Sequence, residues 1–343
     1  MIVIGADTHK RSYAFAAVVA GTGELRSSEQ FRTTSAAHER LLAWARGLAD
    51  ERVWAIEDCR HVSGKLERFL LARGERVIRI PPKLMAGRRR GSRQAGKSDP
   101  IDALAIARAT LEEGIASFQV ACLAGPTREI KLLLDHRDDL VAERTRMQNR
   151  LRWLLHDRWP ALELAPGVLS RDRHTERLAA RLARAEQTIE IKVMRDQLRR
   201  IRELNRSVGR LEDELSDLVA AQQPRLLELP GIGVLTAAKL ISEIAGIERF
   251  TSPSKLARLA GVAPVPASSG ARHRYRIDRG GNRQLNCALH RIAITQSRVH
   301  PPARHYLERK QTEGKTRREA IRCLKRQLAR TVYTTLKNEP LLT

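Results

Sequence analysis

Four acidic residues near the start of the chain have the types and positions needed for metal-dependent phosphodiester chemistry. Asp7 and Glu57 end two short apolar runs, and Asp99 and Asp102 open a later helical segment. The i, i+3 spacing of the last two places both carboxylates on one helix face. Carboxylate oxygens select Mg²⁺ or Mn²⁺, which can activate a nucleophile and stabilise a leaving oxygen. The four acids therefore predict a divalent-metal site that acts on nucleic acid.

These acids can meet only if the segments around them form an α/β domain. Apolar alternation predicts strands over residues 2–4, 13–19, 29–32, 53–56 and 76–80. Helical spacing predicts helices over residues 35–49, 61–72 and 99–113, with Ser35 as the cap of the first. If the first and fourth strands are neighbours, as in a ribonuclease H-like (RuvC-like) fold, all four carboxylates reach one edge of the sheet.

Each acid taken alone is also consistent with a structural role. Asp99 is a good N-cap for a helix, and Asp102 in the first turn would favour the helix dipole. The combination of one acid on each of two strand ends and two on the next helix favours catalysis. We interpret His9, Lys10 and Asp58, which flank the set, as solvated neighbours.

The chain is strongly basic, with a formal net charge of +24 and a pI near 11.0. This excess predicts a polyanionic partner. Only 4% of the residues are aromatic, which favours phosphate contacts over base stacking. Two segments concentrate the candidate phosphate-binding side chains, which are Lys83, Arg88, Arg89, Arg90, Arg93 and Lys97 in the first and Arg272, Arg274, Arg276, Arg279 and Arg283 in the second.

Residues 127–223 are predicted to form long charged helices. Apolar residues spaced by three or four form a coiled-coil stripe of Ile191, Met194, Leu198, Ile201, Leu204, Val208, Leu211, Leu215 and Leu218. Such a stripe fits a helical hairpin within one chain and a coiled coil between two chains. We favour self-association, as a dimer or a tetramer.

Glycines return after residue 223 and mark a third segment. Gly231 and Gly233 lie in a tight turn that opens a helix, in the manner of a helix-hairpin-helix. Backbone N–H groups at such a turn can hold a phosphate, and a plain connecting turn fits equally well. The sequence thus predicts an α/β domain over 1–126, an all-α coiled-coil region over 127–223 and a mostly helical domain over 224–343.

The four cysteines and the hydropathy pattern indicate a cytoplasmic protein. The cysteines lie far apart and form no CxxC pair, which argues against a zinc ribbon and a disulfide framework. The uncharged stretch over residues 12–23 is too short to cross a membrane. We expect reduced thiols and no membrane partner.

Several motifs resemble those of the DEDD transposases of bacterial insertion sequences. In the N-terminal part these are Gly5-Ala6-Asp7-Thr8-His9-Lys10, Ile56-Glu57 and Lys97-Ser98-Asp99-Pro100-Ile101-Asp102-Ala103. In the C-terminal part they are Leu229-Pro230-Gly231-Ile232-Gly233, Leu259-Ala260-Gly261-Val262-Ala263-Pro264, Ser268-Ser269-Gly270 and Gly280-Gly281-Asn282-Arg283-Gln284-Leu285. Over essentially its full length the chain is similar to the "one-ten" family of these enzymes, which also includes a pilin-gene invertase. Asn286 departs from the family, which often carries a basic residue there.

The resemblance implies a site-specific DNA recombinase that cuts and rejoins strands of a donor and a target. It implies that the four acids hold Mg²⁺ and that a C-terminal serine forms a covalent link to DNA. We assign that serine as Ser269, with Ser268 in reserve. The resemblance also implies a structured noncoding guide RNA that pairs with both DNAs, so that base pairing reads the sequence.

Two other functions fit the same residues. A RuvC-like Holliday-junction resolvase or other nuclease would use the four acids with water as the nucleophile and would need no serine. A non-catalytic nucleic-acid-binding protein would use the acids as helix caps. Trapping of a protein–DNA adduct distinguishes the recombinase from both, and only the binding protein would leave DNA intact.

Overall fold

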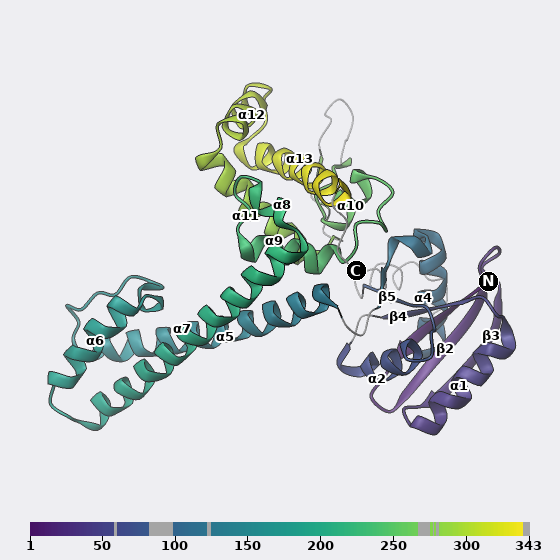
Figure 1. Cartoon of the computed structure of the whole chain (residues 1–343), viewed down its shortest axis with the longest axis horizontal. Helices are drawn as coiled ribbons and strands as arrows, with labels where there is room; N and C mark the ends of the chain where they lie inside the picture. Colours follow the sequence, from purple (N-terminus) through teal and green to yellow (C-terminus); the bar gives the residue numbers. More distant parts are fainter. Residues whose placement is uncertain are drawn as a thin grey trace.

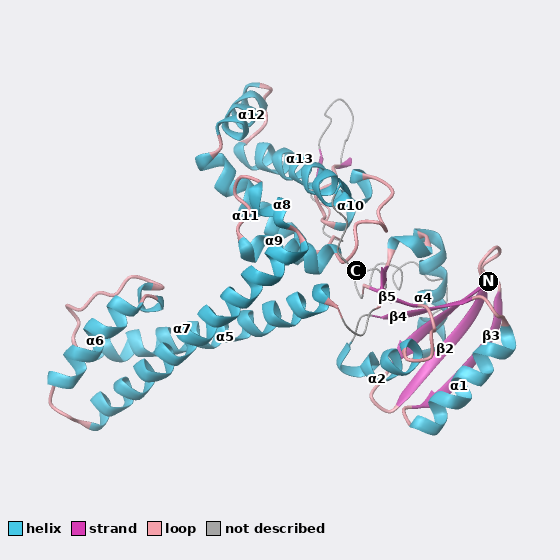
Figure 2. Cartoon of the chain, in the orientation of Figure 1, coloured by secondary structure: helices cyan, strands magenta, loops and turns pink. Residues whose placement is uncertain are grey.

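The computed structural model describes residues 1–57, 60–81, 99–121, 125–266, 275–276, 278 and 281–338. An α/β domain at the N-terminus is joined to a helical domain at the C-terminus, and a long helical hairpin projects away from both (Figure 1). Apart from one short pair near the C-terminal domain, the described strands lie in the N-terminal domain (Figure 2). The order of an α/β domain followed by helices is as the sequence predicts.

The N-terminal domain is built on a six-stranded sheet of order β3-β2-β1-β4-β5-β6. Its strands are β1 (Ile2–Thr8), β2 (Ser12–Val19), β3 (Leu25–Arg32), β4 (Arg52–Glu57), β5 (Val77–Ile80) and β6 (Gln119–Val120). Strand β4 lies parallel to β1 and β5, whereas β2 is antiparallel to β1 and β3, and β6 to β5. The predicted neighbour relation between the first and fourth strands is confirmed.

Helices cover both faces of this sheet. Helices α1 (Ser35–Leu48) and α2 (Arg60–Leu71) lie on one face, where Ile4, Trp54 and Leu66 belong to one apolar cluster. Helix α4 (Asp99–Glu113) covers the other face, where Val3 and Ile106 belong to a second cluster. Successive residues of a strand point to opposite faces, so the sequence pattern assigns every strand residue to one of these layers.

Local details of this domain differ from the sequence-based expectation. Thr34, not Ser35, caps α1, because its Oγ1 accepts the Ala37 N–H at 3.3 Å. Asp99 is the first residue of α4 and not a residue before it. Strand β6, which is two residues long, has no alternation from which it could be predicted.

The middle of the chain is a hairpin of α5 (Pro126–Arg158) and α7 (Ile189–Gln222), which lie side by side along their length (Figure 1). A short 3₁₀ turn (Val168–Ser170) and α6 (Asp172–Arg184) close its far end. Arg137 pairs with Glu212 at 2.6 Å and Arg200 with Glu143 at 2.8 Å, across the two helices. These pairs connect the two antiparallel helices of the hairpin.

The predicted apolar stripe of α7 is buried by other helices of the same chain. Ile191, Met194, Leu198 and Ile201 are buried against α5 and α6, together with Leu151. The expectation that the stripe joins two chains is therefore wrong for these residues. The hydropathy pattern could not decide this, because a coiled-coil stripe is equally buried by a helix of its own chain.

The C-terminal domain packs its helices around a separate core. Its elements are α8 (Pro224–Glu228), α9 (Val234–Ile244), α10 (Pro253–Leu259), β7 (Val265–Pro266), β8 (Tyr275–Arg276), α11 (Arg283–Val299), α12 (Pro301–Thr312) and α13 (Arg317–Asn338). Ile130 and Leu134 of α5 and Leu215 and Val219 of α7 belong to the same core. Residue 223 thus divides the sequence where it was predicted to, but it does not divide the core. The ends of α5 and α7 belong to the core of the C-terminal domain.

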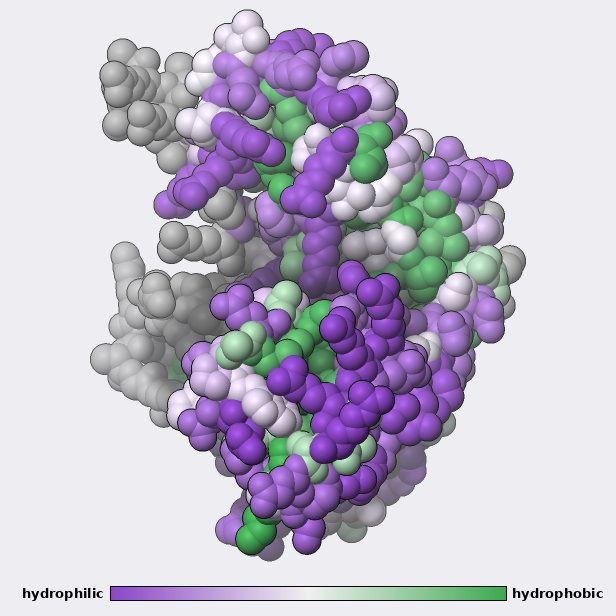
Figure 3. Space-filling view, turned by 90° about the vertical axis from the view of Figure 1, so that its left-hand side faces the viewer, coloured by the Kyte–Doolittle hydropathy of each residue, from purple (hydrophilic) through white to green (hydrophobic). Residues whose placement is uncertain are grey.

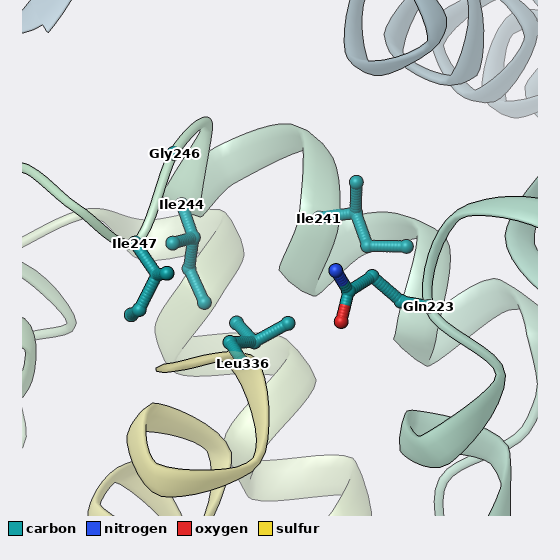
Figure 4. A pocket seen from close by; sticks show the side chains of 6 residues that line it. All are labelled: Gln223, Ile241, Ile244, Gly246, Ile247 and Leu336. Atoms are coloured by element: carbon teal, nitrogen blue, oxygen red, sulfur yellow. The ribbon is translucent and has the colours of Figure 1, made fainter. Parts of the chain in front are cut away.

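One small space lies in the described part of this core. A space of about 10 Å³ at the base of α13, close to the volume of one water molecule, is lined by Gln223, Ile241, Ile244, Gly246, Ile247 and Leu336 (Figure 4). The surface at the hairpin end of the molecule is mostly hydrophilic, with small separated apolar areas (Figure 3). No described helix has the length and apolar content needed to span a membrane.

Candidate active site

The sheet brings Asp7 and Glu57 together at one edge. Ala6 of β1 pairs in parallel register with Ile56 of β4, so Asp7 and Glu57, which follow them, lie side by side. Neighbouring strands are about 4.8 Å apart. Both acids lie on the sheet face covered by α4, because Ala6 and Ile56 belong to the apolar cluster on the other face.

Helix α4 supplies the other two acids in its first turn. Asp102 is only 6% exposed, and Asp99 lies at the outer end of the helix, where its side chain is 43% exposed. Gly5 of β1 makes the close packing of this helix possible. A Cβ atom at that position would lie 2.1 Å from the carbonyl oxygen of Ala103, so the strand and helix backbones are in direct contact.

His9 lies between the buried Asp7 and the more exposed Asp99. Its Nε2 atom is 3.3 Å from Asp7 Oδ2 and 3.3 Å from Asp99 Oδ1. Burial raises the pKa of Asp7, the charges of Asp102 and Asp99 raise it further, and His9 lowers it. The interpretation of His9 as a solvated neighbour is therefore wrong. Its position beyond the end of β1 shows no periodicity that could direct it toward the acids.

This arrangement fits a divalent cation. Three ligand atoms, one each from Asp7, His9 and Asp99, lie within 4.8 Å of one another, and Asp102 is close enough to act on Asp7 electrostatically. Carboxylates gathered in a half-buried site repel one another unless a cation is bound between them. Oxygen donors of this kind suit Mg²⁺ and Mn²⁺.

The predicted nucleophiles, Ser268 and Ser269, lie outside the described residues, but the residues on both sides are placed. Val265 pairs with Arg276 and Pro266 with Tyr275 in an antiparallel ladder between β7 and β8. Residues 267–274 therefore connect the two adjacent ends of a hairpin. We refer to residues 267–274 as the serine loop.

Two glycines and an asparagine join the segment after α10 to the segment at the start of α11. A Cβ atom on Gly281 would lie 2.3 Å from the Cα of Gly261, so the two backbones touch. The Asn286 amide donates to the carbonyls of Ala260 at 2.8 Å and Gly261 at 3.2 Å. Lys325 of α13 donates to the Asn286 carbonyl oxygen at 2.6 Å. Asn286 thus has a structural function here.

A second chain of contacts joins the same region to the hairpin. Lys131 of α5 donates to Glu243 of α9 at 3.0 Å, and Asn282 donates to the other carboxylate oxygen of Glu243 at 2.7 Å. Asn282 is the N-cap of α11, and its N–H is bonded to the Leu259 carbonyl. The N-terminal part of α5 is therefore linked through Glu243 to the N-cap of α11 and, through that residue, to the end of α10.

Comparison with known proteins identifies the family of this chain. Residues 223–308 match the model described as "Transposase IS116/IS110/IS902 family", and residues 4–160 match a DEDD model described as "Transposase". A protein of insertion element IS110 from Streptomyces coelicolor, described as uncharacterized, is 30% identical over 292 residues, 71% of each chain. The chain belongs to the IS110/IS116/IS902 transposases. It is an enzyme that cleaves and joins DNA.

Two other matches complete the comparison. An uncharacterized 44.8 kDa protein of insertion element IS116 from Streptomyces clavuligerus is 26% identical over 390 aligned residues, which cover 100% of this transposase and 96% of the relative. Among solved structures, T. thermophilus RuvC in complex with a Holliday junction substrate matches 35% of the transposase and 99% of its own chain. That match has 16% identity and a TM-score of 0.28.

The candidate phosphate-binding residues of the transposase are only partly placed. Lys83, Arg88, Arg89, Arg90, Arg93 and Lys97 lie outside the described residues, as do Arg272, Arg274 and Arg279. Arg276 and Arg283 are exposed and lie at the two ends of the segment after the serine loop. Both are accessible to a nucleic acid.

The glycine turn of the transposase joins α8 to α9 as a helix-hairpin-helix would. Gly231 has a φ of 79°, and its backbone lies against Ile292 and Thr295 of α11. The N–H of Gly233 donates to Thr236 Oγ1 at 3.0 Å. A phosphate bound at this turn would therefore have to use the later N–H groups of the α9 N-terminus or displace Thr236.

Proposed function

We propose that this transposase is a site-specific recombinase in which Ser269 attacks DNA and the acids Asp7, Glu57, Asp99 and Asp102 assist through Mg²⁺ or Mn²⁺. The observation that carries the proposal is the convergence of the acids from two strands and a helix. Bound at these acids, the ion would supply positive charge where negative charge develops on the reacting oxygens.

The covalent step follows from ordinary phosphoryl-transfer chemistry. The Oγ of Ser269 forms a bond to the scissile phosphorus, the phosphodiester bond to one deoxyribose oxygen breaks, and that oxygen leaves with a proton. The serine proton passes to a base or to solvent. Reversal of this step with a deoxyribose hydroxyl of another strand rejoins DNA and releases the serine, so no oxidant or nucleotide cofactor is needed.

The serine and the acids must meet for this chemistry. Within the chain, Arg258 of α10 contacts Glu113 of α4 at 3.5 Å. Glu113 ends the helix that Asp99 begins, about 20 Å away at 1.5 Å per residue. We propose a site in which the serine of one protomer acts with the acids of another. A mixture of inactive Ser269→Ala and Asp102→Ala proteins should then regain activity, whereas a site within one chain would leave the mixture inactive.

Adduct trapping tests the nucleophile. A denaturing gel of the wild-type protein with Mg²⁺ and a cleavable DNA should show a protein–DNA adduct, and Ser269→Ala should bind DNA without forming one. Ser268→Ala is the matched control and should keep most of the adduct. An adduct mapped to any other residue would overturn the assignment.

The acidic cluster also favours a second candidate, hydrolysis by a RuvC-like nuclease mechanism, because the cluster is complete without a serine. In that case wild-type protein cleaves DNA with Mg²⁺ and no adduct forms. Loss of cleavage in Asp102→Ala with intact folding is common to both mechanisms. The adduct alone separates them.

Guide RNA and self-association belong to the same proposal. The basic charge and the scarcity of aromatic residues support binding to the backbone of structured RNA as well as DNA. Sequencing of RNA that co-purifies with the protein tests the first point. For the second, Trp153 and Ile189 are exposed by 78% and 81% on the two long helices of the hairpin, and light scattering of Trp153→Ser would test their contribution to an oligomer.

A further inference from the structure

The acidic site contains one group that the four-acid description leaves out. His9 follows β1 by one residue and turns back toward the acids at the sheet edge. Its side chain is half exposed, so a bound ion and solvent can both reach it. The inference below rests on the proposed function, since it concerns the same metal site.

The position of the imidazole nitrogen matches that of a metal ligand. Its separations from Asp7 Oδ2 and Asp99 Oδ1 are both 3.3 Å, longer than the 2.7–2.9 Å typical of a charge-assisted hydrogen bond. Adjacent ligands of an octahedral ion, at about 2.1 Å from the metal, are separated by about 3.0 Å. A nitrogen equidistant from two carboxylate oxygens at nearly this spacing is therefore placed to share an ion with them.

The surroundings of His9 support a role at the ion. Asp7 is buried and lies close to the negative charges of Asp99 and Asp102, so an added positive charge is favourable there. Asp99 and Asp102 stand in the first turn of α4, whose dipole also favours negative charge at this end. The site thus gathers negative ligands around a single nitrogen donor.

We propose that His9 is a ligand of the metal ion at this site, together with Asp7 and Asp99, through its Nε2 atom. An imidazole ligand changes which ions the site prefers. Nitrogen donors favour first-row transition metals, whereas Mg²⁺ is satisfied by oxygen donors and retains its water ligands. His9 should therefore raise the affinity for Mn²⁺ more than the affinity for Mg²⁺.

The test measures metal binding by the full-length protein without DNA. Pulsed electron paramagnetic resonance of bound Mn²⁺ should show a nitrogen hyperfine coupling in the wild type and none in His9→Asn. Calorimetry should show a loss of Mn²⁺ affinity of about tenfold or more in His9→Asn, with a smaller loss for Mg²⁺. His156→Asn, an exposed histidine on α5, is the control and should leave both signals unchanged.

The outcomes separate this inference from the proposed function. If the wild type binds Mn²⁺ and Asp102→Ala does not, but no nitrogen coupling is seen, the acids hold the ion and His9 does not. If His9→Asn loses Mn²⁺ and Mg²⁺ affinity equally, His9 is not the selective ligand described here. If the wild type binds neither ion, the metal site itself is wrong. Near-ultraviolet circular dichroism of each variant excludes unfolding as the cause.

Discussion

Lys325 donates a hydrogen bond of 2.6 Å to the side-chain oxygen of Asn286, 39 positions earlier in the chain. Asn286 in turn donates to two carbonyls at the end of α10. Burial lowers the pKa of this lysine, because its ammonium group has lost much of its hydration. Asn286 therefore holds both the buried Lys325 ammonium group and the backbone at Ala260 and Gly261, where the segment toward the serine loop begins.

Replacement of Asn286 by alanine should destabilise the protein by about 1–3 kcal/mol, because it leaves Lys325 and two carbonyl oxygens without this partner. Urea unfolding measures the change. Asn286→Asp is the informative companion variant, since it keeps an acceptor for Lys325 but cannot donate to the carbonyls. If both variants are as stable as the wild type, the hydrogen bonds of the Asn286 side chain contribute nothing to the stability of the fold.

Gly281→Ala should destabilise the C-terminal domain by about 1–3 kcal/mol or more, because its new Cβ would lie 2.3 Å from the backbone of Gly261. Thermal unfolding measures this effect. Gly209→Ala in the middle of α7 is the matched control. Nothing lies within 4 Å of its Cβ position, and the variant should gain about 0.5–1 kcal/mol. Equal effects at the two positions would contradict the backbone contact.

Gly5→Ala should disable the acidic site without changing any acid. Its Cβ would lie 2.1 Å from the Ala103 carbonyl oxygen and 2.6 Å from the Ala107 nitrogen, so α4 must move away from β1. A displacement of this size in an active site costs roughly 10²-fold in rate. DNA cleavage assays and Mn²⁺ calorimetry should both show the loss.

Gly47→Ala on α1 provides the control for this prediction. No atom lies within 4 Å of its Cβ position, and it should cleave DNA at the wild-type rate. Unimpaired metal binding by Gly5→Ala would show that the contact between α4 and β1 does not set the geometry of the acids.

Asp7→Asn should make the metal-free protein more stable at neutral pH while abolishing cleavage. Burial and the two aspartates raise the pKa of Asp7 above its ordinary value of 3.8. Between that value and the raised one the folded state binds more protons than the unfolded state, so stability falls as the pH rises through this window. Above the window the ionised carboxylate lowers the free energy of unfolding.

The measurement is urea unfolding at several pH values in a chelating buffer. The difference in stability between Asp7→Asn and the wild type should grow as the pH rises and should shrink when Mn²⁺ is added, because the ion stabilises only the wild type. A difference that is independent of both pH and Mn²⁺ would contradict the prediction.

A feature of the fold or of the site could be predicted from the sequence when it depends on residues close together in the chain. Strand and helix positions in the N-terminal domain follow from local periodicity, and so does the meeting of Asp7 with Glu57 once β1 and β4 are taken as neighbours. The orientation of His9 and the pairing of Lys325 with Asn286 depend on contacts between separate elements. No local pattern in the sequence encodes them.

In the α5–α7 hairpin, the sequence predicts which residues are buried but not which helix buries them. The stripe that includes Leu198 and Ile201 predicts burial correctly, but the partner helix comes from the same chain. The helix-hairpin-helix turn is also predicted correctly as a turn between two helices. That Thr236 occupies the N–H of Gly233 could not be foreseen from the glycine spacing.

Lys131, Glu243 and Asn282 link the N-terminal part of α5 to the N-cap of α11. Helix α5 has 33 residues and therefore extends about 50 Å, with ion pairs that bind it to α7 along the way. We therefore expect the hairpin and the start of α11 to move together. A force that nucleic acid or another protomer applies to the distant tip should therefore be transmitted to the start of α11.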